Sequence, residues 1–88
     1  MMKYFDPSTK FKKRIKKLPK EIVSAYKKRM IIFEADPFDE ILNNHKLHGR
    51  YAHCRSINIT GNWRLVYEDK GSNHYLLVDI GTHAELYE

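Results

Sequence analysis

The apolar residues of the first 35 positions recur with the spacing of an α-helix. Phe11, Ile15 and Leu18 lie three or four residues apart with basic residues between them, which predicts a short amphipathic helix that ends near Leu18. Pro19 interrupts this pattern, because a proline inside a helix removes a hydrogen bond and clashes with the preceding turn. A second apolar stripe then predicts a longer helix, and it consists of Ile22, Tyr26, Met30 and Phe33. We therefore expect two helices that fold back on each other as an antiparallel hairpin.

From residue 51 onward, apolar and polar positions alternate, which is typical of β-strands. Residues 51–59 form the first such run, and Thr60-Gly61 after it is a hairpin turn signal. Two more strands are expected over residues 62–68 and 74–80, with a turn between them. The middle strand leaves open which of its faces enters the core, because apolar residues compete on both: Trp63, Leu65 and Tyr67 on one face and Val66 on the other.

Two shorter elements complete the pattern. Residues 2–5 are expected to form a strand ahead of Asp6-Pro7-Ser8, which supplies the residues of a helix start, and residues 38–42 fit one short helical segment. The predicted order is β-α-α-β-β-β. It is typical of an α+β fold in which the N-terminal helix hairpin packs on one face of a small antiparallel sheet. The other face of the sheet is then free, so the polar residues of the strands become candidates for function.

The composition indicates one small folded domain over residues 1–88. The chain is 42% hydrophobic and 12% aromatic, which is sufficient for a core and untypical of a disordered protein. It contains no run of about 18 apolar residues, and its first ten residues lack the apolar centre of a signal peptide, so we expect a cytosolic protein without a membrane span. Cys54 is the single cysteine, which excludes an internal disulfide, and we expect it to be buried as a small hydrophobe.

The net charge of +5 is unevenly distributed along the chain. Residues 3–29 contain eleven lysines and arginines and two acidic residues, so this part carries +9, and the five basic and nine acidic residues elsewhere give −4. A basic block of this kind can bind nucleic acid or an acidic protein. The simpler interpretation is a lysine-rich helix face that is merely solvated.

Four of the five histidines, at positions 45, 48, 53 and 83, flank or enter the predicted sheet together with three arginines. Antiparallel strands of about seven residues can bring such positions toward one edge. His45-x-x-His48 is not a recognised zinc spacing, so we expect neither a metal nor another cofactor. Metal-independent RNA cleavage needs a base, an acid and fixed positive charge, and histidine and arginine are suited to these tasks. A glycine-rich phosphate loop and a Ser-His-Asp arrangement are both missing, which leaves nucleotide hydrolysis and acyl chemistry without support.

Three sequence elements occur in a recognisable order: Leu47-His48-Gly49, Gly61-Asn62-Trp63-Arg64-Leu65-Val66-Tyr67 and Gly81-Thr82-His83. With Cys54-Arg55-Ser56-Ile57 and the basic helix hairpin, they resemble the RelE/ParE toxin superfamily, and residues 80–87 resemble the end of its YafQ-like branch. The resemblance implies a RelE-like fold and a type II toxin that acts as an endoribonuclease on translated mRNA in the ribosome. The implied cleavage proceeds by attack of the 2′-hydroxyl without a metal. The implied partners are a cognate antitoxin in a heteromeric complex, the ribosome and mRNA, in the cytoplasm and away from membranes.

The resemblance also implies roles for individual residues. His45 and His83 match histidines associated with catalysis, and Arg64 matches a basic residue that is a plausible phosphate ligand. Asn58 stands where the branch has a second catalytic histidine, and Asn62 where it has an aspartate; we keep both as site candidates. Asp79 stands where the branch has a basic residue. His48, His53 or Arg55 are candidates to compensate for these missing groups from neighbouring positions. The residues expected to bind RNA are His48, Arg50, Arg55, Lys12, Lys13 and Lys16.

Two other functions remain open at this stage. One is a ParE-like inhibitor of DNA gyrase, which cuts nothing and has no need of imidazoles at both ends of the sheet. The other is a catalytically weak homologue kept for antitoxin binding, which Asn58 and Asn62 would support because an amide cannot transfer protons at neutral pH.

Overall fold

A computed structural model describes residues 2–87 of the chain. Its helices, 3₁₀ turns and strands follow in the order β1 (Tyr4–Pro7), α1 (Thr9–Ile15), α2 (Lys20–Ala35), η1 (Glu40–Leu42), β2 (His45–Lys46), η2 (Gly49–Tyr51), β3 (Arg55–Asn58), β4 (Trp63–Gly71), β5 (His74–Thr82) and α3 (His83–Tyr87). The predicted α+β fold with an N-terminal helix hairpin is confirmed, and the structure adds the short elements β2, η2 and α3.

The strands form one five-stranded sheet in the order β1-β5-β4-β3-β2. The strands from β2 to β5 pair antiparallel, as predicted for β3, β4 and β5. The first strand departs from the expected antiparallel sheet: β1 pairs parallel with β5, with Tyr4 opposite His74. The sheet is therefore mixed. Parallel neighbours need a long crossover connection, and the helices that follow β1 begin such a connection.

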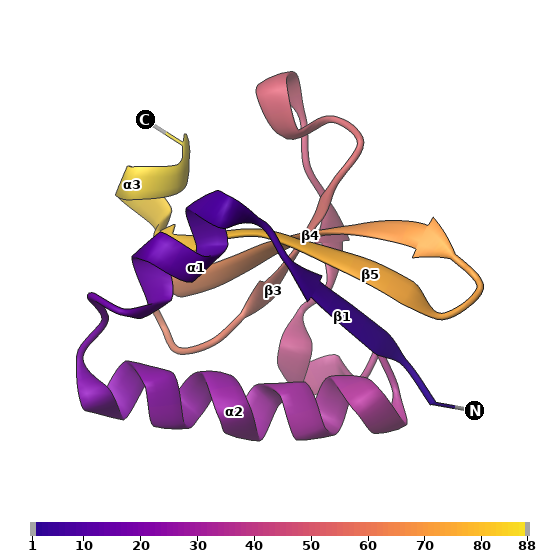
Figure 1. The fold of residues 1–88 in the computed structure, drawn as a ribbon, viewed down its shortest axis with the longest axis horizontal. Helices are drawn as coiled ribbons and strands as arrows, with labels where there is room; N and C mark the ends of the chain where they lie inside the picture. The colour runs from indigo at the N-terminus through magenta and orange to yellow at the C-terminus, as the bar shows by residue number, and fades with distance from the viewer. Residues whose placement is uncertain (1, 88) are drawn as a thin grey trace.

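Helix α2 covers one face of the sheet, and α1 lies beside β5 and adds Phe11 to the same apolar cluster (Figure 1). Helix α1 begins after Ser8, whose hydroxyl accepts a hydrogen bond from the N–H of Phe11 at 3.0 Å, and it ends at Ile15 rather than near Leu18. In α2 the predicted apolar stripe points inward, and Phe33 lies at the centre of an aromatic group, 5.0 Å from the Tyr67 ring and 5.1 Å from the Tyr75 ring. This packing accounts for the helical periodicity of the first 35 residues.

The opposite face of the sheet is covered as well, so the expectation of a free face was wrong. Its apolar cluster lies under α3 and the segment around η2 and contains Leu47, Tyr51, Cys54, Val66 and Leu86. Because β4 is buried on both sides, its apolar residues do not alternate with polar ones. That is why the sequence left the core face of this strand open: Leu65 and Tyr67 face the α2 side, and Val66 faces the α3 side.

The predicted strand over residues 51–59 is shorter in the structure. Residues 49–51 form a 3₁₀ turn, and the strand starts only at Arg55. Tyr51 and Cys54 are three residues apart and would face opposite sides of a strand, but both pack in the second cluster because the chain turns at η2. Cys54 is buried, as predicted, and burial raises the pKa of its thiol. Among residues 2–87, none of the helices is long and apolar enough to cross a membrane.

Candidate functional site

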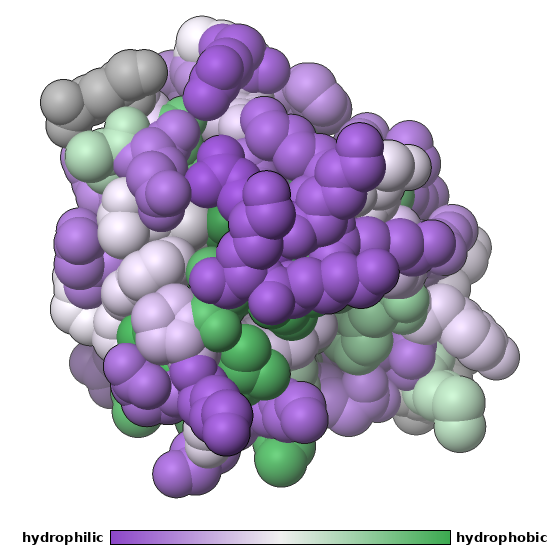
Figure 2. Space-filling model, turned by 60° about the vertical axis from the view of Figure 1, so that its left-hand side comes forward, coloured by the Kyte–Doolittle hydropathy of each residue, from purple (hydrophilic) through white to green (hydrophobic). Residues whose placement is uncertain are grey.

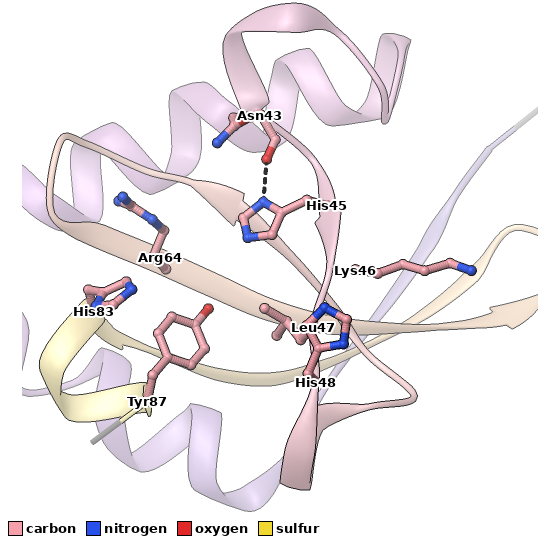
Figure 3. A pocket seen from close by; sticks show the side chains of 8 residues that line it. All are labelled: Asn43, His45, Lys46, Leu47, His48, Arg64, His83 and Tyr87. Atoms are coloured by element: carbon pink, nitrogen blue, oxygen red, sulfur yellow. Dashed lines mark hydrogen bonds between the residues drawn. The ribbon is translucent and has the colours of Figure 1, made fainter.

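A pocket of about 470 Å³ lies on the α3 side of the sheet. Its walls come from the segment around β2, from β4 and from α3, and are formed by Asn43, His45, Lys46, Leu47, His48, Arg64, His83 and Tyr87 (Figure 3). The lining combines three imidazoles, one ammonium and one guanidinium with no carboxylate. Such a lining is suited to a negatively charged ligand, because nothing in it neutralises the two fixed cations.

The pairing of the strands explains why residues far apart in sequence meet here. Residues directly opposite each other on neighbouring strands share a face of the sheet. His45 pairs with Ser56, and Ser56 pairs with Val66, so all three belong to the α3 side. Arg64 lies two residues before Val66 and therefore has the same orientation. His83 joins them because β5 ends beside the start of β4.

His45 is exposed and is held by one hydrogen bond. Its Nδ1 lies 2.8 Å from the carbonyl oxygen of Asn43, a residue with a left-handed φ of 48° at the end of η1. A carbonyl oxygen only accepts hydrogen bonds, so Nδ1 must carry the proton. The other ring nitrogen, Nε2, turns toward the side of Arg64 and His83 (Figure 3). In the neutral ring, Nε2 then has a free lone pair and can take up a proton.

Arg64 is fixed by one of its nitrogens. Nη1 donates to the carbonyl oxygens of Thr60, Gly61 and Trp63 at 3.0, 3.1 and 3.2 Å, in the turn before β4 and at the first residue of that strand. Within the described residues its Nη2 and Nε donate to no other group, and no carboxylate pairs with its charge. The guanidinium is therefore both oriented and available for an anion.

His83 is the first residue of α3, and a capping box determines where this helix starts. The N–H of Thr82 donates to Glu85 Oε1 at 2.8 Å, and the N–H of Glu85 donates to Thr82 Oγ1 at 3.2 Å. The hydrogen bond from Thr82 lowers the pKa of Glu85, and the Arg14 guanidinium acts in the same direction. The N–H of His83 donates to the carbonyl oxygen of Asn62 at 3.0 Å, which ties α3 to the start of β4.

Tyr87 closes one side of the pocket and was missed by the sequence reasoning. Its ring lies edge-on to that of His83 at 4.8 Å, and its hydroxyl donates to Ser56 Oγ at 3.0 Å. Two sequence signals could have found it. Thr82-x-x-Glu85 is a capping-box pattern that predicts a helix, and Tyr87 follows His83 at the i+4 spacing that places side chains on one helix face.

The other predicted site residues are distributed unevenly. His48 lines the pocket, whereas Asn62 contributes a backbone carbonyl from an exposed position. Asn58 lies opposite Arg64 in the sheet, but its side chain does not line the pocket. Arg50 donates to the carbonyl oxygen of Leu86 at 2.8 Å and lines an adjoining hollow of about 320 Å³.

Arg55 and His53 lie outside the pocket. Arg55 donates to Asn44 Oδ1 at 2.6 Å and stacks over the Phe38 ring at 5.1 Å, and His53 faces Glu68 at 3.9 Å. Of the three residues considered as substitutes for the missing histidine, only His48 reaches the pocket.

The three predicted lysines are exposed on α1 and at its C-terminal end. Figure 2 shows the side of the molecule that carries α1 and the beginning of α2, where hydrophilic side chains form one continuous area. The exposed lysines of this part of the chain are Lys10, Lys12, Lys13, Lys16, Lys17 and Lys20.

In the part of the chain that the structure describes, no three His, Cys, Asp or Glu side chains come together in a way that could hold a metal ion.

The family model of bacterial YafQ toxins of type II toxin-antitoxin systems matches residues 3–88. Among solved structures, YafQ from Escherichia coli strain BL21(DE3) superimposes with a TM-score of 0.81 at 20% identity, covering 98% of this chain and 99% of the other. The Escherichia coli DinJ-YafQ toxin-antitoxin complex gives a TM-score of 0.80 at 20% identity with full coverage of both chains. A metal-bound toxin from Helicobacter pylori is 26% identical with a TM-score of 0.71, over 99% of this chain and 100% of that one. No curated protein sequence matches.

Proposed function

The chain belongs to the family of bacterial YafQ toxins of type II toxin-antitoxin systems, and from this premise we propose that it is an endoribonuclease that cuts translated mRNA inside the ribosome. The observation that carries the proposal is the meeting of His45, Arg64 and His83 at one exposed, carboxylate-free pocket. A protein that only blocks a partner has no need of two exposed imidazoles beside an uncompensated guanidinium.

The pocket supplies the groups that RNA cleavage requires. His45 Nε2 takes the proton of the ribose 2′-hydroxyl, and the resulting oxygen attacks the neighbouring phosphorus. The bond from phosphorus to the 5′-oxygen breaks, and His83 donates a proton to that leaving oxygen. Arg64 binds the non-bridging oxygens, on which negative charge increases in the transition state. The products are a 2′,3′-cyclic phosphate and a 5′-hydroxyl, and no metal takes part.

The ribosome contributes what the pocket lacks. Asn58 and Asn62 stand where the family has proton-transferring groups, so this chain relies on fewer of them, with His48 as the one nearby replacement in the pocket. A ribosome that holds and bends the mRNA supplies orientation, which is worth several orders of magnitude in rate. The exposed lysines Lys12, Lys13 and Lys16 hold the ribosomal RNA backbone without reading its sequence.

A cognate antitoxin completes the proposed system. The Escherichia coli relative was crystallised as a toxin-antitoxin complex with DinJ, and we propose a heteromeric complex of the same general kind for this chain in the cytoplasm. The antitoxin would neutralise the toxin by covering the basic pocket or by preventing its access to the ribosome.

One alternative has its own support: a weak nuclease retained for antitoxin binding. It is favoured by the position of Asn58, which lies opposite Arg64 in the sheet and carries an amide in place of an imidazole. In that case the pocket would bind RNA but turn it over slowly.

Expression of the toxin without its antitoxin tests the proposal. We expect growth arrest, with new mRNA 5′ ends confined to translated frames. The double variant His45→Ala/His83→Ala should relieve the arrest and abolish these ends while still copurifying with the antitoxin. Arrest with intact mRNA, or full toxicity of the double variant, would contradict RNA cleavage and direct attention to gyrase.

A further inference from the structure

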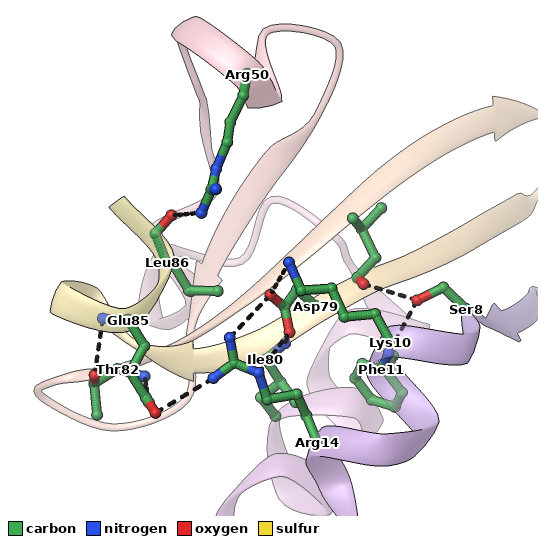
Figure 4. Close-up of polar contacts among 11 residues, drawn as sticks. Ser8, Lys10, Phe11, Arg14, Arg50, Asp79, Ile80, Thr82, Glu85 and Leu86 are labelled. Atoms are coloured by element: carbon green, nitrogen blue, oxygen red, sulfur yellow. Dashed lines mark hydrogen bonds and ion pairs between the residues drawn. The ribbon is translucent and has the colours of Figure 1, made fainter. Parts of the chain in front are cut away.

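A buried carboxylate links α1 to the end of β5. The side chain of Asp79 is 0% exposed and is contacted by two cations from α1 (Figure 4). Lys10 Nζ lies 3.3 Å from its Oδ2, and Arg14 Nε lies 3.4 Å from its Oδ1. Its Oδ1 also accepts the N–H of Ile80 at 2.8 Å. A buried carboxylate needs a partner, and of the two cations Arg14 is the more buried, so Asp79 is an anchor for Arg14 in particular.

Arg14 extends this contact to α3. Its Nη1 lies 3.3 Å from Glu85 Oε2, while Oε1 of the same carboxylate accepts the N–H of Thr82. Arg14 therefore bridges a buried carboxylate on β5 and the carboxylate that caps α3. The planar guanidinium suits two such partners, because its nitrogens donate in fixed directions.

Gly81 makes room for this bridge. A Cβ at this position would lie 3.2 Å from Arg14 Nη1 and 3.2 Å from Glu85 Oε1, so a larger residue would press on both partners. The guanidinium passes close to the backbone here because the glycine has no side chain. Three separate features, the buried Asp79, the missing Cβ and the capping carboxylate, thus converge on one side chain.

From this geometry we propose that Arg14 is a positioning residue for His83: anchored by Asp79, it holds Glu85 and with it the first turn of α3. The effect on catalysis rests on the proposed function; the effect on His83 does not. Helix α3 has five residues and is too short to be stable alone, so its orientation depends on contacts outside it. Asp79 then acts as the buried counter-charge of this device, in a place where the family carries a basic residue.

Lys10 provides a matched control. It contacts the same carboxylate from the same helix and carries the same charge, but it does not reach α3. Replacing Arg14 or Lys10 by alanine removes one cation from Asp79 in each case, and only the Arg14 variant releases Glu85. Glu85→Gln breaks the ion pair from the other side and keeps an oxygen that can accept from Thr82.

Kinetics on mRNA-programmed ribosomes provide the first test. We expect Arg14→Ala to lower kcat about 10- to 100-fold with little change in KM, because a displaced acid impairs chemistry more than binding. Lys10→Ala should retain nearly the wild-type kcat. Arg14→Lys should rescue in part, since lysine can reach one carboxylate but not both. The double variant Arg14→Ala/Glu85→Gln should be no worse than Arg14→Ala alone.

An RNA-independent measurement separates this inference from the proposed function. The ring proton resonances of His83 should shift, and the amide exchange of residues 83–85 should accelerate, in Arg14→Ala and Glu85→Gln but not in Lys10→Ala. If the wild-type protein does not cut RNA, the proposed function fails while these spectra still decide the role of Arg14. Equal changes in the Lys10 and Arg14 variants, or none in either, would overturn the inference.

Discussion

Arg64 combines a fixed orientation with a free charge. Because Nη1 is committed to the carbonyl oxygens of the β3–β4 turn, the remaining donors point in a defined direction. Such preorganisation matters most for charge that appears only in the transition state, since no reorganisation is needed at that moment.

Replacing this residue should therefore impair chemistry. We expect Arg64→Ala to cost about 1 to 3 kcal/mol of transition-state stabilisation, the usual value of a charge-assisted hydrogen bond. Arg64→Lys keeps the charge but not the fork of donors, so its cleavage rate should lie between those of the wild type and Arg64→Ala. Single-turnover cleavage on ribosomes measures the effect. Thermal melting of each variant shows how much stability is lost with the hydrogen bonds to the turn, so that a loss of fold is not mistaken for a loss of catalysis. A variant with a wild-type rate would remove Arg64 from the mechanism.

At the residue scale, the sequence predicted which side chains meet at the pocket better than it predicted the contacts that hold them. The chemistry of imidazole and guanidinium pointed to four histidines and three arginines, and the resemblance to the toxin family singled out His45, Arg64 and His83 among them. Asn43 could not, because its contribution is a backbone carbonyl aimed by a left-handed φ, which a pattern of side chains does not record. The catalytic roles themselves stay predictions.

Among the elements, α3 depends on its cap. Glu85 has a pKa below the ordinary value of 4.5, because the Thr82 N–H stabilises its charged form with help from Arg14. The folded state therefore binds this proton less readily than the unfolded state does. The resulting stabilisation is complete above the ordinary value and is lost as the pH falls below it through the lowered pKa of the folded state.

We accordingly expect α3 to loosen in acid before the sheet does. Amide exchange and the resonances of residues 83–87, followed from neutral pH down to acid, measure this directly. Glu85→Gln is the control: it should start from a looser helix at neutral pH and lose most of the acid dependence. Identical acid profiles in both proteins would show that another group is responsible.

Sequence reasoning assigned the core side only for elements with one buried face. Helix α2 has a clear apolar stripe because only one side packs on the sheet. Strand β4 was predicted as a strand, but its core face could not be assigned because it is buried on both sides. The turn at η2 was missed, since Tyr51 and Cys54 face the same side, as they would not in a strand. Helix α3 was missed because five residues hold too few apolar positions to show a period.

The whole molecule has a layer on each side of the sheet, and the pocket belongs to the smaller layer. Leu86 and Leu42 are both 0% exposed, but Leu86 packs in the cluster beneath the pocket and Leu42 in the one beneath α2. Each change to alanine should destabilise the fold by about 2 to 5 kcal/mol, as buried leucine truncations do. At a temperature where both variants remain folded, we expect Leu86→Ala to lose far more activity. Equal activity in the two variants would mean that the second cluster does not position α3.

The segregation of charge can be tested at the same scale. Most of the net charge of +9 in residues 3–29 is carried by exposed lysines. If these lysines bind ribosomal RNA, each one releases counterions from the RNA backbone. Replacing Lys12, Lys13 and Lys16 by glutamine should raise KM, leave kcat unchanged and lower the slope of log KM against log salt by about one for each phosphate that is no longer neutralised. A control with Lys27, Lys28 and Lys70 replaced removes the same net charge elsewhere on the surface. If both triple variants behave alike, net charge alone steers the protein, and the lysines around α1 serve only to keep it solvated.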